Sequence, residues 1–239
     1  MFPDGAQKKQ YVREKFSKVT RRYDLVNVLG SFALDLCWRN KAAKELARQP
    51  GPILDLCAGT FTLSKEIVRQ RPRRVIALDI CWEMLAYGRH RLQSHPALTF
   101  IQPVVGDGER LPFPGESFYG VAVAFGVRNL SRLEQGLQEI YRVLKPQGKV
   151  VILEFSRPSL PLFSSLYRAY LFYFMPFLGG RLTGDREAYE YLARSIELFP
   201  SPEETASLMQ EVGFKKVSFK PLSLEIVTIY TGIKETKEE

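Results

Sequence analysis

The stretch "KKVSFKPLSLEIVTIYTGIK", residues 215–234, decides the fold of this 239-residue chain. It holds two segments of strand-like composition, "KKVSFKPL" and "IVTIYTGIK", and only three residues separate them. A parallel pair needs a connection of about a dozen residues or more, so these two strands must pair antiparallel. The sequence therefore predicts a sheet that ends in an antiparallel hairpin.

Upstream of this hairpin, apolar strand segments alternate with helical ones. This alternation is typical of a parallel sheet with both faces covered. A parallel sheet finished by an antiparallel strand indicates the Rossmann-like α/β fold of class I methyltransferases, with seven strands and a ligand at their carboxyl ends. The expected strands are "PILDLCA", "RVIALDI", "LTFIQPVV", "FYGVAVAFG" and "KVVILEF", and the expected helices lie near residues 7–20, 34–48, 62–70, 83–93 and 131–144.

The same alternation divides the chain into parts. Residues 157–200 interrupt it and are rich in Phe, Tyr, Leu and Pro, which indicates an inserted cap over a substrate. The four predicted parts are a basic helical N-terminal segment that closes over the site (1–50), the α/β core (51–156), the apolar helical cap (157–200) and a C-terminal helix with the hairpin (201–239).

Composition and charge indicate which kinds of binding partner the chain can have. The hydrophobic content of 45% and the charged content of 25% are ordinary for a soluble globular protein. Of the net charge of +8, residues 1–50 contribute +6, from eleven Lys and Arg against five Asp and Glu. This excess indicates an anionic surface as neighbour or, with better support from charge alone, a solvated helix face. Because no nucleic-acid-binding motif is present, we expect no nucleic-acid partner.

Cysteine and histidine usage indicates neither a metal site nor a disulfide framework. The three cysteines form no CxxC pair, and the two histidines have no ligand spacing to them. The first residues lack the apolar segment of a signal peptide. The segment Ala169–Gly180, "AYLFYFMPFLGG", is shorter than the roughly 20 residues that span a bilayer. We expect a cytoplasmic protein and leave open a peripheral contact with the inner face of the membrane and a homodimer.

A second stretch, "LDLCAGTFTLS" (residues 54–64), predicts a ligand site. Its strand feeds a turn at Gly59 and Thr60, where glycine lets the backbone approach a ligand. Twenty residues beyond Gly59 the next strand ends in Asp79, which can accept hydrogen bonds from both hydroxyls of a ribose. Asp107 follows the third strand, where an acid can accept from an adenine amino group. Taken singly, each acid is equally well explained as a helix cap or turn residue.

The cofactor is predicted to be S-adenosylmethionine (SAM) and not NAD. The full G-x-G-x-x-G pattern is absent, since only Gly59 matches it. Without a glycine run to cradle phosphates, pyrophosphate binding is disfavoured, whereas SAM carries no phosphate. The antiparallel last strand favours the same choice.

These motifs resemble those of the ubiquinone/menaquinone-biosynthesis C-methyltransferases. The matching stretches run from "YDLVN" through "FGVRNL" and "SIELFP" to "EVGF" and span roughly Phe16 to the C-terminus. The resemblance implies a SAM-dependent enzyme that methylates a ring carbon of a prenylated quinol such as demethylmenaquinol. It carries SAM binding onto Thr60, Asp79, Asp107 and Gly108, and the full cofactor-binding set that we predict is Asp55, Gly59, Thr60, Phe61, Asp79, Ile80, Asp107 and Gly108.

The sequence departs from this family pattern beside the glycine turn. Phe61 and Thr62 stand where a small residue and an acid are usual, and Tyr119, Ala124 and Glu225 are further departures. Either Phe61 points into the core and SAM binding is intact, or its ring occupies the methionine subsite. Losing one charged hydrogen bond costs on the order of 1.5–3 kcal/mol, which weakens a site without abolishing it. We therefore expect a working enzyme.

Three residues are the predicted catalytic set. Arg128, in "FGVRN", would stabilise a phenolate, unless it forms a structural ion pair beneath the site. Asn129 would fix the orientation of Arg128, and Tyr23 would cover the sulfonium by cation–π contact or serve only in packing. No histidine is placed to act as a base, so the base is unassigned.

The apolar segment Leu160–Leu178 has two interpretations. It forms either a buried core helix or the entrance for an isoprenoid tail drawn from a membrane, where basic N-terminal residues would add about 1 kcal/mol each. Two alternatives to the quinol methyltransferase stay open. One is a SAM methyltransferase for another apolar small molecule, and the other is a non-catalytic quinone-binding relative.

Overall fold

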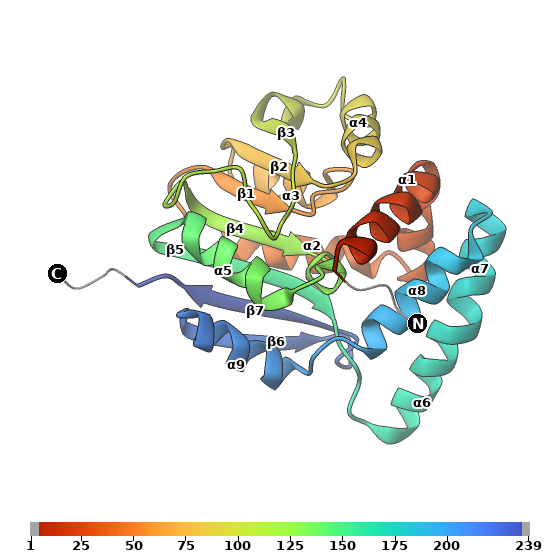
Figure 1. Cartoon of the computed structure of the whole chain (residues 1–239). Helices are drawn as coiled ribbons and strands as arrows, with labels where there is room; N and C mark the ends of the chain where they lie inside the picture. Colours follow the sequence, from red (N-terminus) through yellow and green to blue (C-terminus); the bar gives the residue numbers. More distant parts are fainter. Residues whose placement is uncertain (1–4, 236–239) are drawn as a thin grey trace.

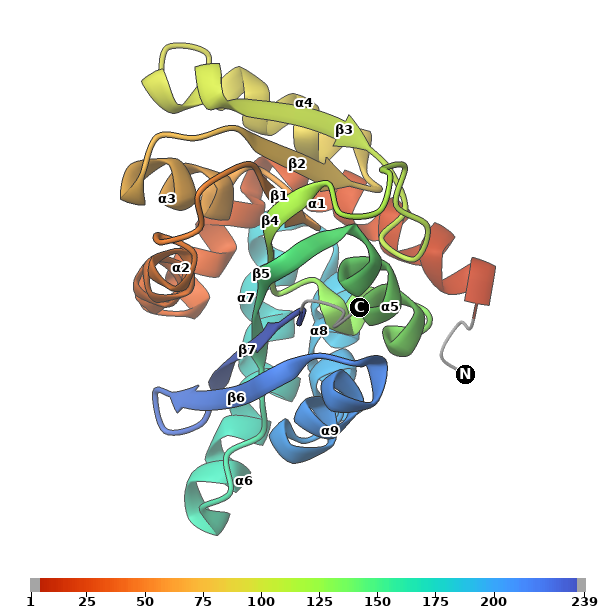
Figure 2. The same ribbon diagram turned by 90° about the vertical axis from the view of Figure 1, so that its left-hand side faces the viewer.

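A single seven-stranded sheet forms the centre of the computed structural model, which describes residues 5–235 (Figures 1 and 2). The strand order is β3-β2-β1-β4-β5-β7-β6. The strands are β1 (Ile53–Leu56), β2 (Val75–Asp79), β3 (Ile101–Val105), β4 (Phe118–Ala124), β5 (Leu144–Phe155), β6 (Lys215–Leu222) and β7 (Val227–Ile233).

The predicted hairpin is confirmed. Strand β7 lies between β5 and β6 and runs antiparallel to both, with Ile152 opposite Tyr230 on one side and Phe219 opposite Tyr230 on the other. The pairs among β1 to β5 are all parallel. This is the sheet expected of a class I methyltransferase, and it places the carboxyl ends of β1, β2, β3 and β4 along one edge.

Helices cover both faces of the sheet, which explains the continuous apolar strands. On one face Ile53 and Ala122 pack against α2 and α3, and on the other Leu54 and Val121 pack against α5 and α9. The helices are α1 (Gly5–Gly30), α2 (Leu34–Glu45), α3 (Thr62–Gln70), α4 (Trp82–Arg91), α5 (Leu133–Val143), α6 (Pro161–Ala169), α7 (Met175–Thr183), α8 (Arg186–Glu197) and α9 (Pro202–Val212), with short turns η1 (Pro96–Phe100), η2 (Val127–Asn129) and η3 (Tyr170–Phe174).

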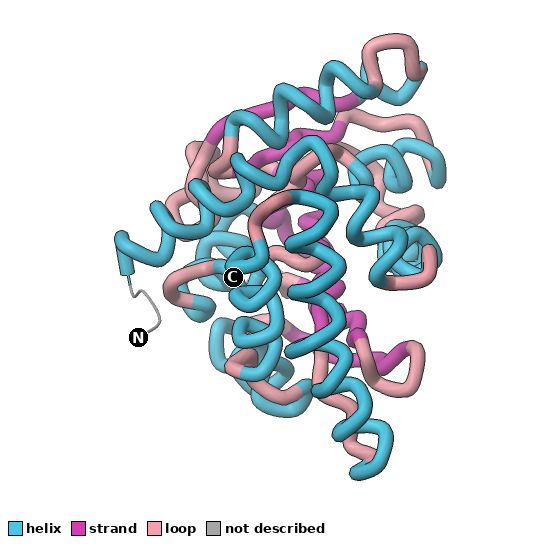
Figure 3. Tube along the Cα trace, turned by 90° about the vertical axis from the view of Figure 1, so that its right-hand side faces the viewer, coloured by secondary structure: helices cyan, strands magenta, loops and turns pink. Residues whose placement is uncertain are grey.

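The first helix is longer than the expected segment 7–20, because no glycine or proline interrupts it before Gly30. It packs against α7 and α8 through a third apolar cluster that includes Val19, Val26 and Leu171. Figure 1 shows these helices gathered at one end of the sheet, and Figure 3, which views the molecule from that end, shows them in front of the strands. The N-terminal segment and the cap therefore form one layer over the strand ends. The domain boundaries stay a prediction.

A π-helical turn, η3, joins α6 to α7 within this layer. Pro176 follows it and has no N–H, which removes one helical hydrogen bond and favours the wider turn. Among residues 5–235, no helix has the length and apolar character needed to cross a membrane. Within the same residues, no group of three or more His, Cys, Asp or Glu side chains is arranged to hold a metal ion.

Candidate cofactor and substrate site

Two neighbouring cavities lie where the helical layer meets the strand ends. The smaller, about 80 Å³, is lined by the ends of β1 and β2, the loop after β3 and α1, and we call it the strand-end cavity. The larger, about 460 Å³, is lined mainly by apolar side chains of α1, α2 and α6 to α8, and we call it the apolar cavity. Four residues line both cavities and so mark their junction: Phe16, Tyr23, Arg39 and Phe125.

The glycine turn and Asp79 form the floor of the strand-end cavity. Gly59 has a φ of +52°, and its N–H donates to Asp79 Oδ2 at 2.9 Å. The backbone N–H of Cys81 donates to Asp79 Oδ1 at 2.8 Å. Burial raises the pKa of Asp79, and these backbone hydrogen bonds oppose that effect. A carboxylate has about four acceptor positions, so both oxygens keep capacity for a diol. Asp79 and the adjacent Ile80 both line this cavity.

The side chain of Phe61 lies in the core and not in the strand-end cavity. Its ring is fully buried in the apolar cluster with Trp38 and Leu63, against the backbone of α4 near Gly88. Its backbone is left-handed, with φ 68°, and this conformation turns the ring away from the cavity. The neighbours Thr60 and Thr62 do line the cavity. Of the two positions left open for the Phe61 ring, the structure has the one in the core, and intact SAM binding stays a prediction.

Asp55, also in the predicted cofactor-binding set, is placed behind the cavity lining. It is 1% exposed, and the Ser64 hydroxyl donates to its Oδ2 at 2.5 Å. Burial raises the pKa of Asp55 to about 7. Within residues 5–235, its Oδ1 has no hydrogen-bond partner. Because β1 carries Asp55 beneath the turn, we correct the expectation of direct contact: Asp55 and Phe61 support the loop from behind.

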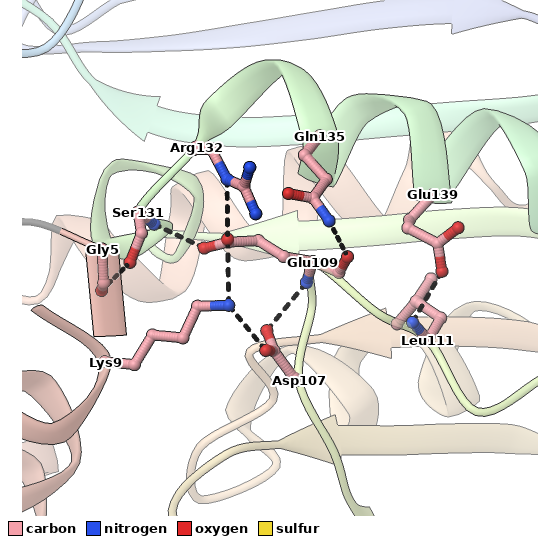
Figure 4. A network of polar contacts seen from close by, with 9 residues as sticks. All are labelled: Gly5, Lys9, Asp107, Glu109, Leu111, Ser131, Arg132, Gln135 and Glu139. Carbon is pink, nitrogen blue, oxygen red and sulfur yellow. Dashed lines mark hydrogen bonds and ion pairs between the residues drawn. The ribbon is translucent and has the colours of Figure 1, made fainter. Parts of the chain in front are cut away.

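Asp107 belongs to a network that fastens α1 over the strand-end cavity (Figure 4). The Lys9 ammonium lies 2.7 Å from Asp107 Oδ2 and 2.9 Å from Glu109 Oε2. Although partial burial acts the other way, these two partners raise the pKa of Lys9. The Glu109 N–H donates to Asp107 Oδ1 at 2.9 Å. A side chain at Gly108 would press against Leu130 and Leu56, so this position is closed to larger residues.

A second contact fastens α1 to the glycine turn. The Thr60 hydroxyl donates to Asp24 Oδ1 at 2.7 Å, and Asp24 also pairs with Arg91 of α4. The turn, α4 and α1 are thus joined beside the cavity. Thr60 is at once a lining residue and a tether for the N-terminal helix.

Arg128 lines the apolar cavity, and its charge is already paired. Its guanidinium lies 2.7 Å from Glu154 Oε1 and donates to the Phe125 carbonyl at 2.6 Å and to Ser195 Oγ at 3.3 Å. Both partners of the ion pair are almost fully buried, at 4% and 0% exposed. Any action of Arg128 on a substrate would have to compete with these three partners.

The other two predicted catalytic residues lie on either side of this pair. Asn129 lines the strand-end cavity, and its Oδ1 accepts from the Tyr191 hydroxyl at 3.1 Å, so its role in orienting Arg128 stays a prediction. Tyr23 lies at the junction, where burial raises its pKa. That location suits the predicted cover over the reacting centre.

Sequence reasoning missed one pair at the junction. Asp35 and Arg39 stand one turn apart on α2, with Oδ2 and Nε 3.8 Å apart and both side chains 8% exposed. The Arg39 guanidinium also stacks on the Phe125 ring, 5.0 Å from its centroid. Opposite charges four residues apart beside Trp38, in "LDLCWRN", were the available signal.

The residues of the strand-end cavity fit the adenosyl sulfonium of SAM. Asp79 offers acceptors for a ribose, Asp107 offers an acceptor for an amino group, and the acids Asp79, Asp107 and Glu109 together favour a cation. The cavity is smaller than the roughly 300 Å³ or more of ordinary ligand pockets. Because Lys9 and other α1 residues form one wall of this cavity, we infer that α1 moves outward to admit the cofactor.

The fold and this site define a class I SAM-dependent methyltransferase. A crystal structure of a SAM-dependent methyltransferase from Thermotoga maritima has a TM-score of 0.66 at 17% identity and covers 93% of this chain and 99% of its own. The [4+2]-cyclase SpnF has a TM-score of 0.72 at 14% identity and covers 98% of both chains. At such identities these neighbours establish the fold alone.

Proteins related in sequence identify the family. A protein of Geobacter sulfurreducens named ubiquinone/menaquinone biosynthesis C-methyltransferase UbiE is 40% identical over 234 residues, covering 97% of this chain and 91% of that protein. A protein of the same name from Rickettsia akari is 37% identical over 236 residues, covering 97% and 95%. Residues 5–234 match the ubiE/COQ5 methyltransferase family, and the chain belongs to that family.

Proposed function

We propose that this protein transfers a methyl group from SAM to a ring carbon of a prenylated quinol, in the biosynthesis of a respiratory quinone. The observation that carries the proposal is the apolar cavity of about 460 Å³, which joins the strand-end cavity at Phe16, Tyr23, Arg39 and Phe125. A flat aromatic ring at the junction and a prenyl tail in the apolar cavity suit that shape. The names of the relatives support the same substrate class.

The residues divide the work between the two cavities. SAM, when bound, supplies an electrophilic methyl group. Asp79 is proposed to hold the ribose, Asp107 and Gly108 to flank the adenine, and Thr60 to position the amino-acid end. Tyr23 and Phe125 exclude water at the junction, which strengthens the electrostatic interactions there. The protein thus mainly orients the two reactants.

The proposal includes peripheral contact with an anionic membrane. Phe32 and Leu166 both line the apolar cavity and are exposed, at 78% and 66%, so they lie at its mouth. Leu162 and Phe177 are exposed nearby on α6 and α7, at 87% and 62%. Each such side chain that a bilayer buries contributes about 1.5–3 kcal/mol. This surface would let a prenyl tail enter without crossing water.

Vesicle binding tests this contact. The double variant Leu162→Ser/Phe177→Ser should bind phosphatidylglycerol vesicles roughly tenfold or more weakly in co-sedimentation, because two side chains no longer enter the bilayer. Phe100→Ser is the control, since Phe100 is an exposed aromatic residue of η1, next to β3 at the opposite edge of the sheet. Equal binding by the double variant and the wild type would remove the membrane from the proposal. A homodimer stays a prediction.

Calorimetry and product analysis test the activity itself. The purified protein should bind SAM, and a short-chain prenyl naphthoquinol should gain one methyl group on a ring carbon, identified by mass spectrometry and NMR. The unprenylated naphthoquinol is the matched substrate, and we expect slower turnover because it leaves the apolar cavity unfilled. Equal turnover of both would favour another apolar small molecule as substrate. An absence of SAM binding at millimolar concentration would favour the non-catalytic alternative.

A further inference from the structure

The ion pair on α2 has a chemical role in the proposed reaction. We infer that Asp35 accepts the proton of the quinol hydroxyl and that Arg39 holds the resulting phenolate. This inference rests on the proposed function and assigns the base that the sequence left unassigned.

A ring that receives a methyl group must lie where the two cavities meet, and Arg39 is one of the four residues that line both. Asp35 lines the apolar cavity one helical turn away. Arg128 lines the apolar cavity alone, and Asn129 lines the strand-end cavity alone. Among the charged groups, the α2 pair is therefore best placed to contact an oxygen of the ring.

The choice of base follows from the groups that face the apolar cavity. Burial raises the pKa of Tyr170 and Tyr191 to about 12, and it also raises those of Tyr23, Tyr167 and Tyr189, so these phenols hold their protons at neutral pH. Of the described residues lining this cavity, Asp35 is the one carboxylate, and none is a histidine. The charged and titratable groups there are Lys15, Tyr23, Asp35, Arg39, Arg128, Tyr167, Tyr170, Tyr189 and Tyr191.

Asp35 is held in a fixed orientation. The Ser31 hydroxyl lies 3.1 Å from its Oδ1, and the Asp35 backbone N–H donates to the same Ser31 oxygen at 3.2 Å. Its Oδ2 faces Arg39 at 3.8 Å, beyond hydrogen-bond distance. One carboxylate oxygen is thus bonded and the other keeps capacity for a substrate proton.

Arg39 has donors that the protein does not use. Its Nε is buried, and within residues 5–235 this atom has no hydrogen-bond partner. Buried polar atoms are nearly always bonded, so an unbonded guanidinium nitrogen calls for an explanation. A phenolate oxygen between Asp35 and Arg39 would supply the missing acceptor. Stacking on Phe125 keeps the guanidinium plane in place meanwhile.

The quinol O–H bond breaks, a bond from that hydrogen to an Asp35 carboxylate oxygen forms, and the electron pair stays on the quinol oxygen. The charge is shared with the ring carbon, which becomes nucleophilic, while Arg39 stabilises the oxygen. After methylation the ring carbon releases its proton to water and Asp35 returns its proton to the oxygen. One proton leaves for each methyl group transferred.

A binding experiment without turnover tests Arg39. The probe is 4-nitro-1-naphthol, whose ionised form absorbs at longer wavelength, titrated against pH in the presence of saturating protein. An opposite charge within hydrogen-bond reach lowers a pKa by roughly one to three pH units. We expect the wild type to lower the pKa of the bound naphthol, Arg39→Met to abolish the decrease and Arg39→Lys to restore part of it. Bound naphthol with the same pKa in wild type and Arg39→Met would overturn the assignment.

Turnover tests Asp35. General-base catalysis contributes roughly 10²- to 10⁴-fold, so Asp35→Asn should lower kcat by that factor with unchanged SAM affinity. The exposed pair Arg186 and Glu190 on α8 has the same spacing, so Arg186→Met and Glu190→Gln are the controls. Full turnover by folded Asp35→Asn, verified by circular dichroism, would overturn the role of Asp35. Loss of SAM binding or turnover in the wild type would instead refute the proposed function, and the naphthol titration would still decide Arg39.

Discussion

Two buried arginines line the same apolar cavity, and their surroundings differ. Arg128 of η2 has Glu154, a backbone carbonyl and Ser195 as partners, all within 3.3 Å. Arg39 of α2 has one ion-pair contact at 3.8 Å and the face of an aromatic ring. The first arginine has its hydrogen-bond partners inside the protein, whereas the second keeps N–H donors for a ligand.

This difference distinguishes an arginine that stabilises the fold from one that can contact the substrate. A buried charge with complete partners is costly to remove, because the partner that stays behind is left unpaired. A buried charge with unused donors is costly to keep unless a ligand completes it. We therefore propose that Arg128 and Glu154 hold η2 against β5 and α8 and that α2 contacts the substrate, while the catalytic role expected of Arg128 stays an untested prediction.

The largest expected effect is a loss of stability when Arg128 is replaced. Arg128→Met leaves Glu154 buried and unpaired, and removing one partner of such a pair costs about 3–5 kcal/mol. The free energy of unfolding in urea should fall by that amount. Arg39→Met, measured the same way, should lower the free energy of unfolding less, because Arg39 Nε has no hydrogen-bond partner within residues 5–235 and its ion-pair contact is 3.8 Å long.

The double variant Arg128→Met/Glu154→Gln is the control for that measurement. Removing the charge of Glu154 as well should recover part of the lost stability, since no uncompensated charge is then buried. If Arg128→Met retained full stability but lost turnover, the two arginines would have exchanged roles.

A smaller effect is expected at Phe61, which packs in the same apolar cluster as Phe125, the ring beneath Arg39. Removing a buried Phe costs about 3–5 kcal/mol, and relief of its left-handed backbone returns about 1–2 kcal/mol. Phe61→Gly should therefore lower the free energy of unfolding by about 1–4 kcal/mol while SAM affinity changes little. Urea unfolding and SAM calorimetry measure the two quantities.

The opposite result at Phe61 has a clear meaning. Unchanged stability with much tighter SAM binding would place the ring in the methionine subsite. The contrast between the two arginines would then no longer hold, because the apolar cluster beside Arg39 would belong to the cofactor site. Leu224→Gly, at an exposed turn, is the control for the effect of glycine on stability.

The sequence predicted elements well where local patterns decide them. The hairpin followed from a connection too short for a crossover, and Thr62–Gln70 matches the expected helix residue for residue. The length of α1 was underestimated, since part of its apolar face packs on the distant helices α7 and α8, although no glycine or proline ends the helix before Gly30. The direction of the Phe61 ring and the partners of Arg128 depend on distant residues such as Gly88 and Glu154. No local pattern encodes those contacts.

In the site, too, local patterns predicted some residues, and distant contacts determine the others. Asp79 and Asp107 were predictable because strand ends of a parallel sheet meet at one edge. The pair on α2 was not found, because its importance depends on a junction between two cavities that only the packed helices create.

The smallest expected effect concerns Lys9, whose ion pair is complete like that of Arg128 but partly exposed. Asp107 and Lys9 are 34% and 27% exposed in their side chains, and such pairs contribute at most about 1 kcal/mol. The other partner of Lys9, the buried Glu109, keeps contacts with the Ser131 N–H and Arg132 when Lys9 is replaced. Cofactor binding must open this contact, so Lys9→Met should tighten SAM binding by roughly two- to fivefold. Calorimetry measures it, with the exposed Lys41→Met as control. Weaker binding by Lys9→Met would mean that Lys9 helps to hold the cofactor, and a complete ion pair beside a ligand site would no longer indicate a supporting role.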